Sequence, residues 1–391
     1  MRHICVSLVS DQTIPNILSI YHFKPDELLL ITTDVMEKRG KRVHIVNTLK
    51  RYGSDYDYSG NRSHHIIVKE DSVLDCKRNL DQWIGSDDRE TSTFTVNLTG
   101  GTKIMLIAAY EYFKEYAARM IYIPIGKNEF ITPFPKSEAL KNTALDFRLN
   151  VLDYLTAYGI KIINEHKLSA NCEEAQKRSE LSLWIVKNYN EIKPLMNRLS
   201  EKLRKYRNDK KGFQFNTGYE PKCGQEKELF EKAGIKYENN KYSKHLSKSE
   251  IIYLTGGWLE EYCYNELIQF VGKGIDDVIL GISCKKDNSD NEFDVMFTKD
   301  NALYTVECKS LDQDDDKKTD ALYKIAALQK NFGIKIESFF VSTSPHILYE
   351  DGSLKQHIAA RAEQFKTMVI TPSEVINFAN QVAKKLKIIE E

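Results

Sequence analysis

The chain has 391 residues, of which 41% are hydrophobic and 29% are charged, so it is long enough for two domains and a connector. Its 56 basic and 56 acidic residues cancel, which means that any contact with nucleic acid must come from local patches of charge. No segment resembles a membrane span and no signal peptide is recognisable, so we expect a cytoplasmic protein without membrane contact. The seven cysteines form no CxxC pair and do not cluster with histidines, which argues against a zinc or disulfide framework.

The first 145 residues alternate strand and helix patterns and are expected to form a domain of their own. A helical pattern covers 104–118. Such alternation predicts an α/β, Rossmann-like fold with a mostly parallel sheet and helices on both faces. The strand candidates lie at 4–9, 27–32, 65–68, 93–97 and 119–124.

A glycine turn that joins a strand to a helix is the sharpest feature of this domain. Its amides and the positive end of the helix attract an anion, so the turn is a candidate phosphate site, with a purely structural turn as the alternative. A polar loop after the first strand and two threonines after the second would lie at the same edge, where open parallel sheets bind ligands. The candidates are Asn97, Thr99, Gly100, Gly101, Thr102 and Lys103 in the turn, Ser10, Asp11 and Gln12 in the loop, and Thr32 and Thr33.

Residues 146–250 are expected to be a helical and basic connector or insertion. The stretch 181–206 is predominantly helical in pattern, and 198–211 is rich in lysine and arginine. A solvated helix face explains these charges most simply. The alternative is that they neutralise the phosphates of a nucleic acid.

Residues 251–391 are expected to form a second α/β domain, and two alternating segments in it predict a β-hairpin. The segments are 291–297 and 303–309. With a four-residue loop at 299–302, cross-strand partners have numbers that sum to about 601, so Asp294 lies opposite Glu307. Period-two alternation then keeps Lys309 on the same face as Glu307.

Two carboxylates about 5 Å apart repel each other unless a cation lies between them, and oxygen ligands suit Mg²⁺ or Mn²⁺. Asp294 and Glu307 are therefore candidate metal ligands. Lys309 beside the metal would orient or deprotonate a water molecule, which indicates hydrolysis of a phosphodiester. An exposed strand face that carries a salt bridge is the alternative.

A helix predicted at 255–267 supplies a third carboxylate. Helical periodicity places Glu260 on the apolar side and Glu261 toward the polar side, although a shift of one residue in helix phase would weaken this distinction. An inward carboxylate needs a partner, which makes Glu260 the candidate. A helix at 320–331, with Gln329 as a further candidate, and a strand at 336–342 complete an α-β-β-α-β order.

This order and these residues resemble the restriction-endonuclease-like PD-(D/E)xK nuclease superfamily. Glu307-Cys308-Lys309 and Asp294 match its motif, and Glu260 matches its first-helix acid, whereas the usual Pro-Asp is here Phe-Asp. The resemblance implies Glu260, Asp294, Glu307 and Lys309 as catalytic residues, and the three acids among them as metal ligands.

The N-terminal loops resemble the CRISPR-associated Rossmann-fold (CARF) sensor domain. This resemblance implies a cyclic oligoadenylate ligand, with cyclic tetra-adenylate as the expected ring, bound across a homodimer. The whole chain, including Thr255-Gly256-Gly257-Trp258-Leu259-Glu260-Glu261-Tyr262, resembles the CARF–PD-(D/E)xK nucleases of the Can and Card type. Membership implies that the ring acts as an allosteric activator of cutting in type III CRISPR defence. The implied substrates are single-stranded RNA and DNA, with nicking of supercoiled DNA.

Two other functions remain open from the sequence. A non-enzymatic regulator would bind DNA through 198–211 and show no metal dependence. A ring nuclease would linearise its own ligand in the sensor domain even after Glu307 is removed.

Overall fold

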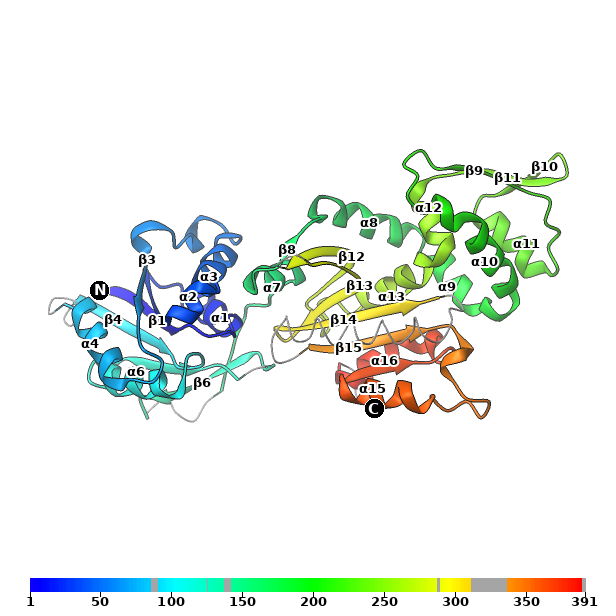
Figure 1. Cartoon of the computed structure of the whole chain (residues 1–391). Helices are drawn as coiled ribbons and strands as arrows, with labels where there is room; N and C mark the ends of the chain where they lie inside the picture. The colour runs from blue at the N-terminus through cyan, green and yellow to red at the C-terminus, as the bar shows by residue number, and fades with distance from the viewer. Residues whose placement is uncertain (86–90, 125, 137–141, 287–288, 311–335, 389–391) are drawn as a thin grey trace.

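The computed structural model describes residues 1–388 apart from 86–90, 125, 137–141, 287–288 and 311–335. Within these residues, no helix combines the length and the apolar character that crossing a membrane requires. The molecule is elongated, with a sheet and its helices at the N-terminal end and a second sheet in the C-terminal half (Figure 1). The predicted helix at 320–331, and Gln329 with it, falls outside the described residues.

Seven strands form the N-terminal sheet, and the predicted mostly parallel arrangement is confirmed because only the last two strands run antiparallel to their neighbours. Helices cover both faces, one group above and one below the sheet in Figure 1. The strands in spatial order are β3 (Ser63–Ile67), β2 (Glu27–Thr32), β1 (Arg2–Leu8), β4 (Ser92–Asn97), β5 (Arg119–Tyr122), β6 (Glu129–Phe134) and β7 (Thr143–Ala144). The helices are α1 (Ile14–Phe23), α2 (Asp34–Lys38), α3 (Lys41–Lys50), α4 (Val73–Trp83) and α6 (Lys103–Lys114).

Six strands form the C-terminal sheet; the three pairs from β8 to β14 are antiparallel, and the pairs β14–β15 and β15–β16 are parallel. The strand β12 is absent from the predicted α-β-β-α-β order, so that order is wrong at this point. Gly281 interrupts the pairing of β12 with β13 at a positive φ of 65°, which obscures the alternation in the sequence. The strands are β8 (Lys161–Ile162), β12 (Asp277–Lys286), β13 (Ser289–Lys299), β14 (Ala302–Lys309), β15 (Ile336–Ser342) and β16 (Thr367–Ile370).

The hairpin of β13 and β14 has the predicted register but a shorter turn. Thr298 pairs with Leu303 and Val295 with Val306, so partner numbers sum to 601. Lys299 pairs with Ala302 as well, which leaves Asp300 and Asn301 as a two-residue turn, not the predicted four-residue loop. Both turn residues have positive φ, 49° and 58°, the conformation that suits the twist of a tight hairpin.

The C-terminal sheet is covered by helices that come from both the middle and the end of the chain (Figure 1). Helix α13 begins at Trp258, three residues later than predicted, because Gly256 has φ 135° and breaks the helical path. A separate three-stranded sheet consists of β10 (Lys236–Glu238), β11 (Lys241–Leu246) and β9 (Phe213–Thr217). The helices are α7 (Val151–Ala157), α8 (Glu165–Lys177), α9 (Ser179–Lys187), α10 (Tyr189–Leu203), α11 (Gly224–Lys232), α12 (Lys248–Ile252), α13 (Trp258–Ile268), α15 (Gln356–Gln364) and α16 (Phe378–Lys385).

One apolar core runs from the N-terminal domain into the C-terminal sheet. It contains residues of β1, α1 and α3, then residues of α7, and then residues of β12, β13, β14 and β15. Packed side chains therefore connect the N-terminal domain to the β13–β14 hairpin. A second core joins α9, α10 and α13 to the other face of the C-terminal sheet.

Candidate functional site

The β13–β14 hairpin brings Asp294 and Glu307 together, as the register predicts. The paired ladder ends at Val295 and Val306, one step before these two acids. Asp294 Oδ2 accepts a hydrogen bond from the amide of Cys308 at 2.7 Å, and Lys309 Nζ donates to Glu307 Oε1 at 2.7 Å. The hairpin thus places two carboxylates and one ammonium at a single site.

Glu260 is the first-helix acid that faces this site, while Glu261 forms a structural ion pair. The charge of Glu260 interacts with those of Asp294, Glu307 and Lys309. Glu261 is 7% exposed and accepts two hydrogen bonds from Arg178, from Nε at 2.9 Å and from Nη2 at 2.5 Å. Glu260 lies near the cluster, as the helical periodicity suggested, but Glu261 is not on a polar face as predicted, because it is buried against Arg178.

Two carboxyl groups of the site, those of Asp294 and Glu260, have a raised pKa. Burial, followed by the charges of Glu260 and Glu307, raises the pKa of Asp294 well above its usual value. Burial, with a further contribution from Glu307, raises the pKa of Glu260 to about 7. The neighbouring acids raise the pKa of Lys309 even though burial lowers it, so its amine keeps its proton. Fully ionised, the three acids would carry more negative charge than Lys309 alone can neutralise.

The donor set suits a divalent cation that prefers oxygen. The charge of Glu307 contributes to the raised pKa of both Asp294 and Glu260, so a cation among the three groups would favour their ionised forms, and oxygen donors are those that Mg²⁺ and Mn²⁺ bind. In the described part of the chain, no three His, Cys, Asp or Glu side chains are gathered as a ready-made cation site. Lys309 instead occupies one oxygen of Glu307, so a cation would displace or share this contact.

A pH titration tests the shifted pKa of Glu260. The folded chain keeps this proton up to about pH 7, whereas the unfolded chain loses it near 4.5, so the folded state binds more protons between these values. Without metal ions, Glu260 should therefore make the free energy of unfolding fall as the pH rises through this window. Denaturant unfolding in a chelating buffer measures the effect, and Glu260→Gln should remove this part of the pH dependence. Equal pH dependence in the two proteins would contradict the shift.

The predicted ligand residues of the N-terminal domain lie at the carboxyl edge of β1, β2 and β4, which are parallel neighbours. The loop after β1 lies against the glycine turn, because a methyl group on Gly100 would collide with the carbonyl oxygen of Leu8. Gly101 has φ 73°, which favours glycine. Ser10, Asp11, Gln12, Thr99, Gly101, Thr102 and Lys103 are at least partly exposed at this edge.

Four of the predicted ligand residues are buried and support the edge from inside. Asn97 donates to the carbonyl of Pro15 at 2.9 Å and accepts from the Thr99 hydroxyl at 2.6 Å, which joins the turn to α1. Thr33 caps α2 through a bond from Met36, and Thr32 is fully buried. The fourth is Gly100, whose role is close backbone approach.

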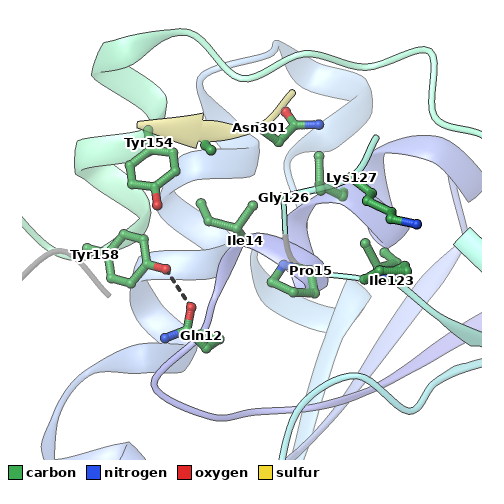
Figure 2. A pocket seen from close by; sticks show the side chains of 12 residues that line it. Gln12, Ile14, Pro15, Ile123, Gly126, Lys127, Tyr154, Tyr158 and Asn301 are labelled. Atoms are coloured by element: carbon green, nitrogen blue, oxygen red, sulfur yellow. Dashed lines mark hydrogen bonds between the residues drawn. The ribbon is translucent and has the colours of Figure 1, made fainter. Parts of the chain in front are cut away.

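Two residues that the sequence did not single out lie near the predicted ones. Tyr158, directly after α7, donates to Gln12 Oε1 at 3.0 Å across a small cavity (Figure 2). Arg207 belongs to the basic stretch, and its charge opposes the rise in the pKa of Glu260, so it lies near the acidic cluster. Nothing in the sequence distinguishes Arg207 from its basic neighbours. Tyr158 is too far from Gln12 in sequence for a local pattern to relate the two.

Fold and site together define a protein in which a Rossmann-like domain is joined to a nuclease-like domain. Two family descriptions match: "Card1 CARF domain" over residues 4–154, and "Card1-like, endonuclease domain" over residues 247–389. The chain therefore belongs to the CARF-containing endonucleases of the Card1 type. No curated protein matches the chain.

Solved structures share the fold over nearly the whole chain. The protein VC1899 from Vibrio cholerae superposes with a TM-score of 0.79 at 18% identity, covering 99% of this chain and 98% of that one. Can2 from Sulfobacillus thermosulfidooxidans, in complex with cyclic tetra-adenylate, superposes with a TM-score of 0.71 at 22% identity over 97% and 98%. A type III CRISPR defence DNA nuclease activated by cyclic oligoadenylate gives 0.52 at 17% identity over 92% of this chain and 51% of that one.

Proposed function

We propose that the chain is a cytoplasmic, cyclic oligoadenylate-activated, metal-dependent endonuclease of type III CRISPR defence. Its substrates are single-stranded RNA and DNA, with nicking of supercoiled DNA. The observation that carries the proposal is the meeting of Glu260, Asp294, Glu307 and Lys309 inside the region that matches the endonuclease family. Cleavage of labelled single strands with and without ring and Mn²⁺ tests it.

The side chains of the site have separate roles in this reaction. Asp294, Glu307 and Glu260 would hold Mg²⁺ or Mn²⁺, which stabilises the charge that develops on a scissile phosphate. Lys309 keeps its proton because Glu307 and Asp294 raise its pKa, so in this state it orients a water molecule or a phosphate oxygen by donating hydrogen bonds. Arg207 beside Glu260 adds positive charge where a phosphate would approach.

The ring would bind at the carboxyl edge of the N-terminal sheet. A cyclic tetra-adenylate repeats one phosphodiester around its circumference, so two copies of the same edge in a homodimer match its symmetry. The exposed residues of that edge offer hydroxyl and ammonium donors. The ring-bound neighbour Can2 supports this assignment through its fold.

Substitution of Lys103 tests the ring site. Lys103 is exposed at the start of α6, so Lys103→Ala should raise the ring concentration for half-maximal cutting by about tenfold without unfolding the domain. Thr102 caps α6 and donates to the carbonyl of Glu70 at 2.7 Å, so Thr102→Ala removes a structural hydroxyl as well as a candidate ring contact. Thr102→Ser keeps the hydroxyl and is its matched control. An unchanged activation curve for Lys103→Ala would remove it from the ring site.

The turn of the β13–β14 hairpin is hydrogen-bonded to the sensor, and the same hairpin carries the proposed catalytic residues. Asn301 is 7% exposed; its Oδ1 accepts from the amide of Leu149 at 2.8 Å and its Nδ2 donates to the carbonyl of Phe147 at 3.3 Å. Its Nδ2 also donates to Asn128 beside β6 of the sensor sheet. Asn301 lines the same cavity as Gln12 and Tyr158 (Figure 2). The hairpin therefore touches the sensor at its turn and carries Asp294 and Glu307 about 20 Å away.

A matched pair of glycine substitutions tests whether the hydrogen bonds of Asn301 transmit ring binding to the active site. Asn301→Gly and Asp300→Gly both keep a turn with positive φ, but only the first removes hydrogen bonds to the sensor. Asn301→Gly should reduce the ratio of cutting with ring to cutting without ring by about tenfold, and Asp300→Gly should leave it unchanged. Ratios that fall equally, or not at all, would contradict transmission through Asn301.

A further inference from the structure

A cavity of about 370 Å³ opens beside the candidate active site, at the carboxyl ends of β15 and β16. Its walls combine aromatic, apolar and basic side chains. One wall comes from the end of α9 and the start of α10, another from the start of α13, and the rest from the segments after β15 and β16. The residues used below are Lys187, Tyr189, Lys193, Trp258, Thr343 and Ile376.

Hydrogen bonds join this cavity directly to the catalytic strand. The amide of Thr343 donates to the carbonyl of Lys309 at 3.1 Å. The carbonyl of Ser310, the next residue, accepts from the Tyr189 hydroxyl at 2.6 Å and from the Thr343 hydroxyl at 2.9 Å. A group held in the cavity would therefore lie beside the end of the strand that carries Lys309.

The lining suits an aromatic and anionic ligand. The rings of Trp258 and Tyr189 lie 5.1 Å apart at 35° and form a deep aromatic wall. Trp258 is fully buried and lies behind Tyr189, which is 9% exposed; its Nε1 has no acceptor among the described residues. Lys187 and Lys193 add positive charge, part of which acts on Glu266 near Lys187.

We propose that the cavity receives one unpaired nucleotide of the strand being cut, adjacent to the scissile phosphate. This inference rests on the proposed nuclease function. It would explain why the substrate is single-stranded, because only an unpaired base can enter the cavity. The volume is that of a small-ligand pocket and admits one base, which in a duplex would stay stacked and paired. Apolar and aromatic walls bind bases with little sequence preference, and lysines bind the adjoining phosphates.

Abasic sites moved along a single-stranded DNA substrate test the proposal. With ring and Mn²⁺ present, cutting at a given bond should fall at least about fivefold when the abasic site occupies one position relative to that bond, and little at other positions. Equal cutting for all positions of the abasic site would overturn the base-binding cavity. Absence of cutting by the wild-type chain on any substrate would instead count against the proposed function, so the two failures are distinguishable.

A second test of the proposal fills the cavity with a larger side chain. Ile376 is 39% exposed at its rim, so Ile376→Trp should raise KM for single strands and abolish the abasic position effect while ring binding stays normal. Val271→Trp, at the other end of α13 and 40% exposed, adds the same ring elsewhere and should keep that effect. If Ile376→Trp does not fold, Ser373→Trp on the same rim takes its place. Retention of the position effect in a folded, filled variant would overturn the proposal.

Discussion

Glu307→Gln is expected to lower ring-dependent cutting by at least about 100-fold while ring binding is unchanged. Glu307 is 5% exposed and binds the Lys309 ammonium, and the proposed metal would share its carboxylate. Glutamine keeps the shape of the side chain but removes the charge that both cations need. Initial rates on labelled single strands and ring binding by calorimetry measure the two effects on one preparation.

Lys309→Ala is the companion variant, since it removes the donor and leaves the acids. It should also lose cutting, and the metal concentration for half-maximal activity should not rise as it does for Glu307→Gln. Wild-type rates in either variant would remove the hairpin from the chemistry. Loss of ring binding in both would mean that the substitutions unfold the chain and test nothing about the site, so the ring-binding measurement is the control.

The neighbouring acids of α13 should have opposite phenotypes. Glu260→Gln should lower cutting by at least about tenfold and cost little stability, because the charged form of Glu260 is already unfavourable in the fold. Glu261→Gln should keep cutting and lower the free energy of unfolding by about 1–3 kcal/mol, because it weakens the buried pair with Arg178. Denaturant unfolding and initial rates on both proteins provide the comparison.

This pair is informative because the two variants change the same residue type at adjacent positions. If Glu261→Gln loses cutting at full stability, Glu261 and not Glu260 is the acid of α13 that serves the active site. If both variants keep wild-type rates, neither glutamate contributes a ligand, and the cluster reduces to Asp294, Glu307 and Lys309.

The hairpin was predictable because strand alternation and a short polar loop determine which residues face each other. Asp294 and Glu307 follow from the register alone, and so does the shared face of Lys309. The mostly parallel N-terminal sheet follows from alternating strands and helices in the same way. In each case the signal is local in sequence.

Contacts between distant segments were not predictable by such rules. The bonds of Asn301 span about 150 residues, and those of Arg178 to Glu261 span 83. Asn97 looks like a ligand residue in sequence, yet its bonds to Pro15 and Ser19 show that it holds the sheet edge together. Polar residues in a loop have the same composition whether they bind a ligand or the fold, and only packing separates the two.

The most direct test is cleavage of labelled single-stranded RNA and DNA by the wild-type chain and by Glu307→Gln, with and without Mn²⁺ and with and without cyclic tetra-adenylate. Cutting that requires both ring and metal and is lost in Glu307→Gln would establish the sensor, the switch and the active site together. Cutting that proceeds equally without the ring would contradict control by the N-terminal domain. No cutting with any ring size or metal would contradict the nuclease and favour a ligand-responsive protein that only binds nucleic acid.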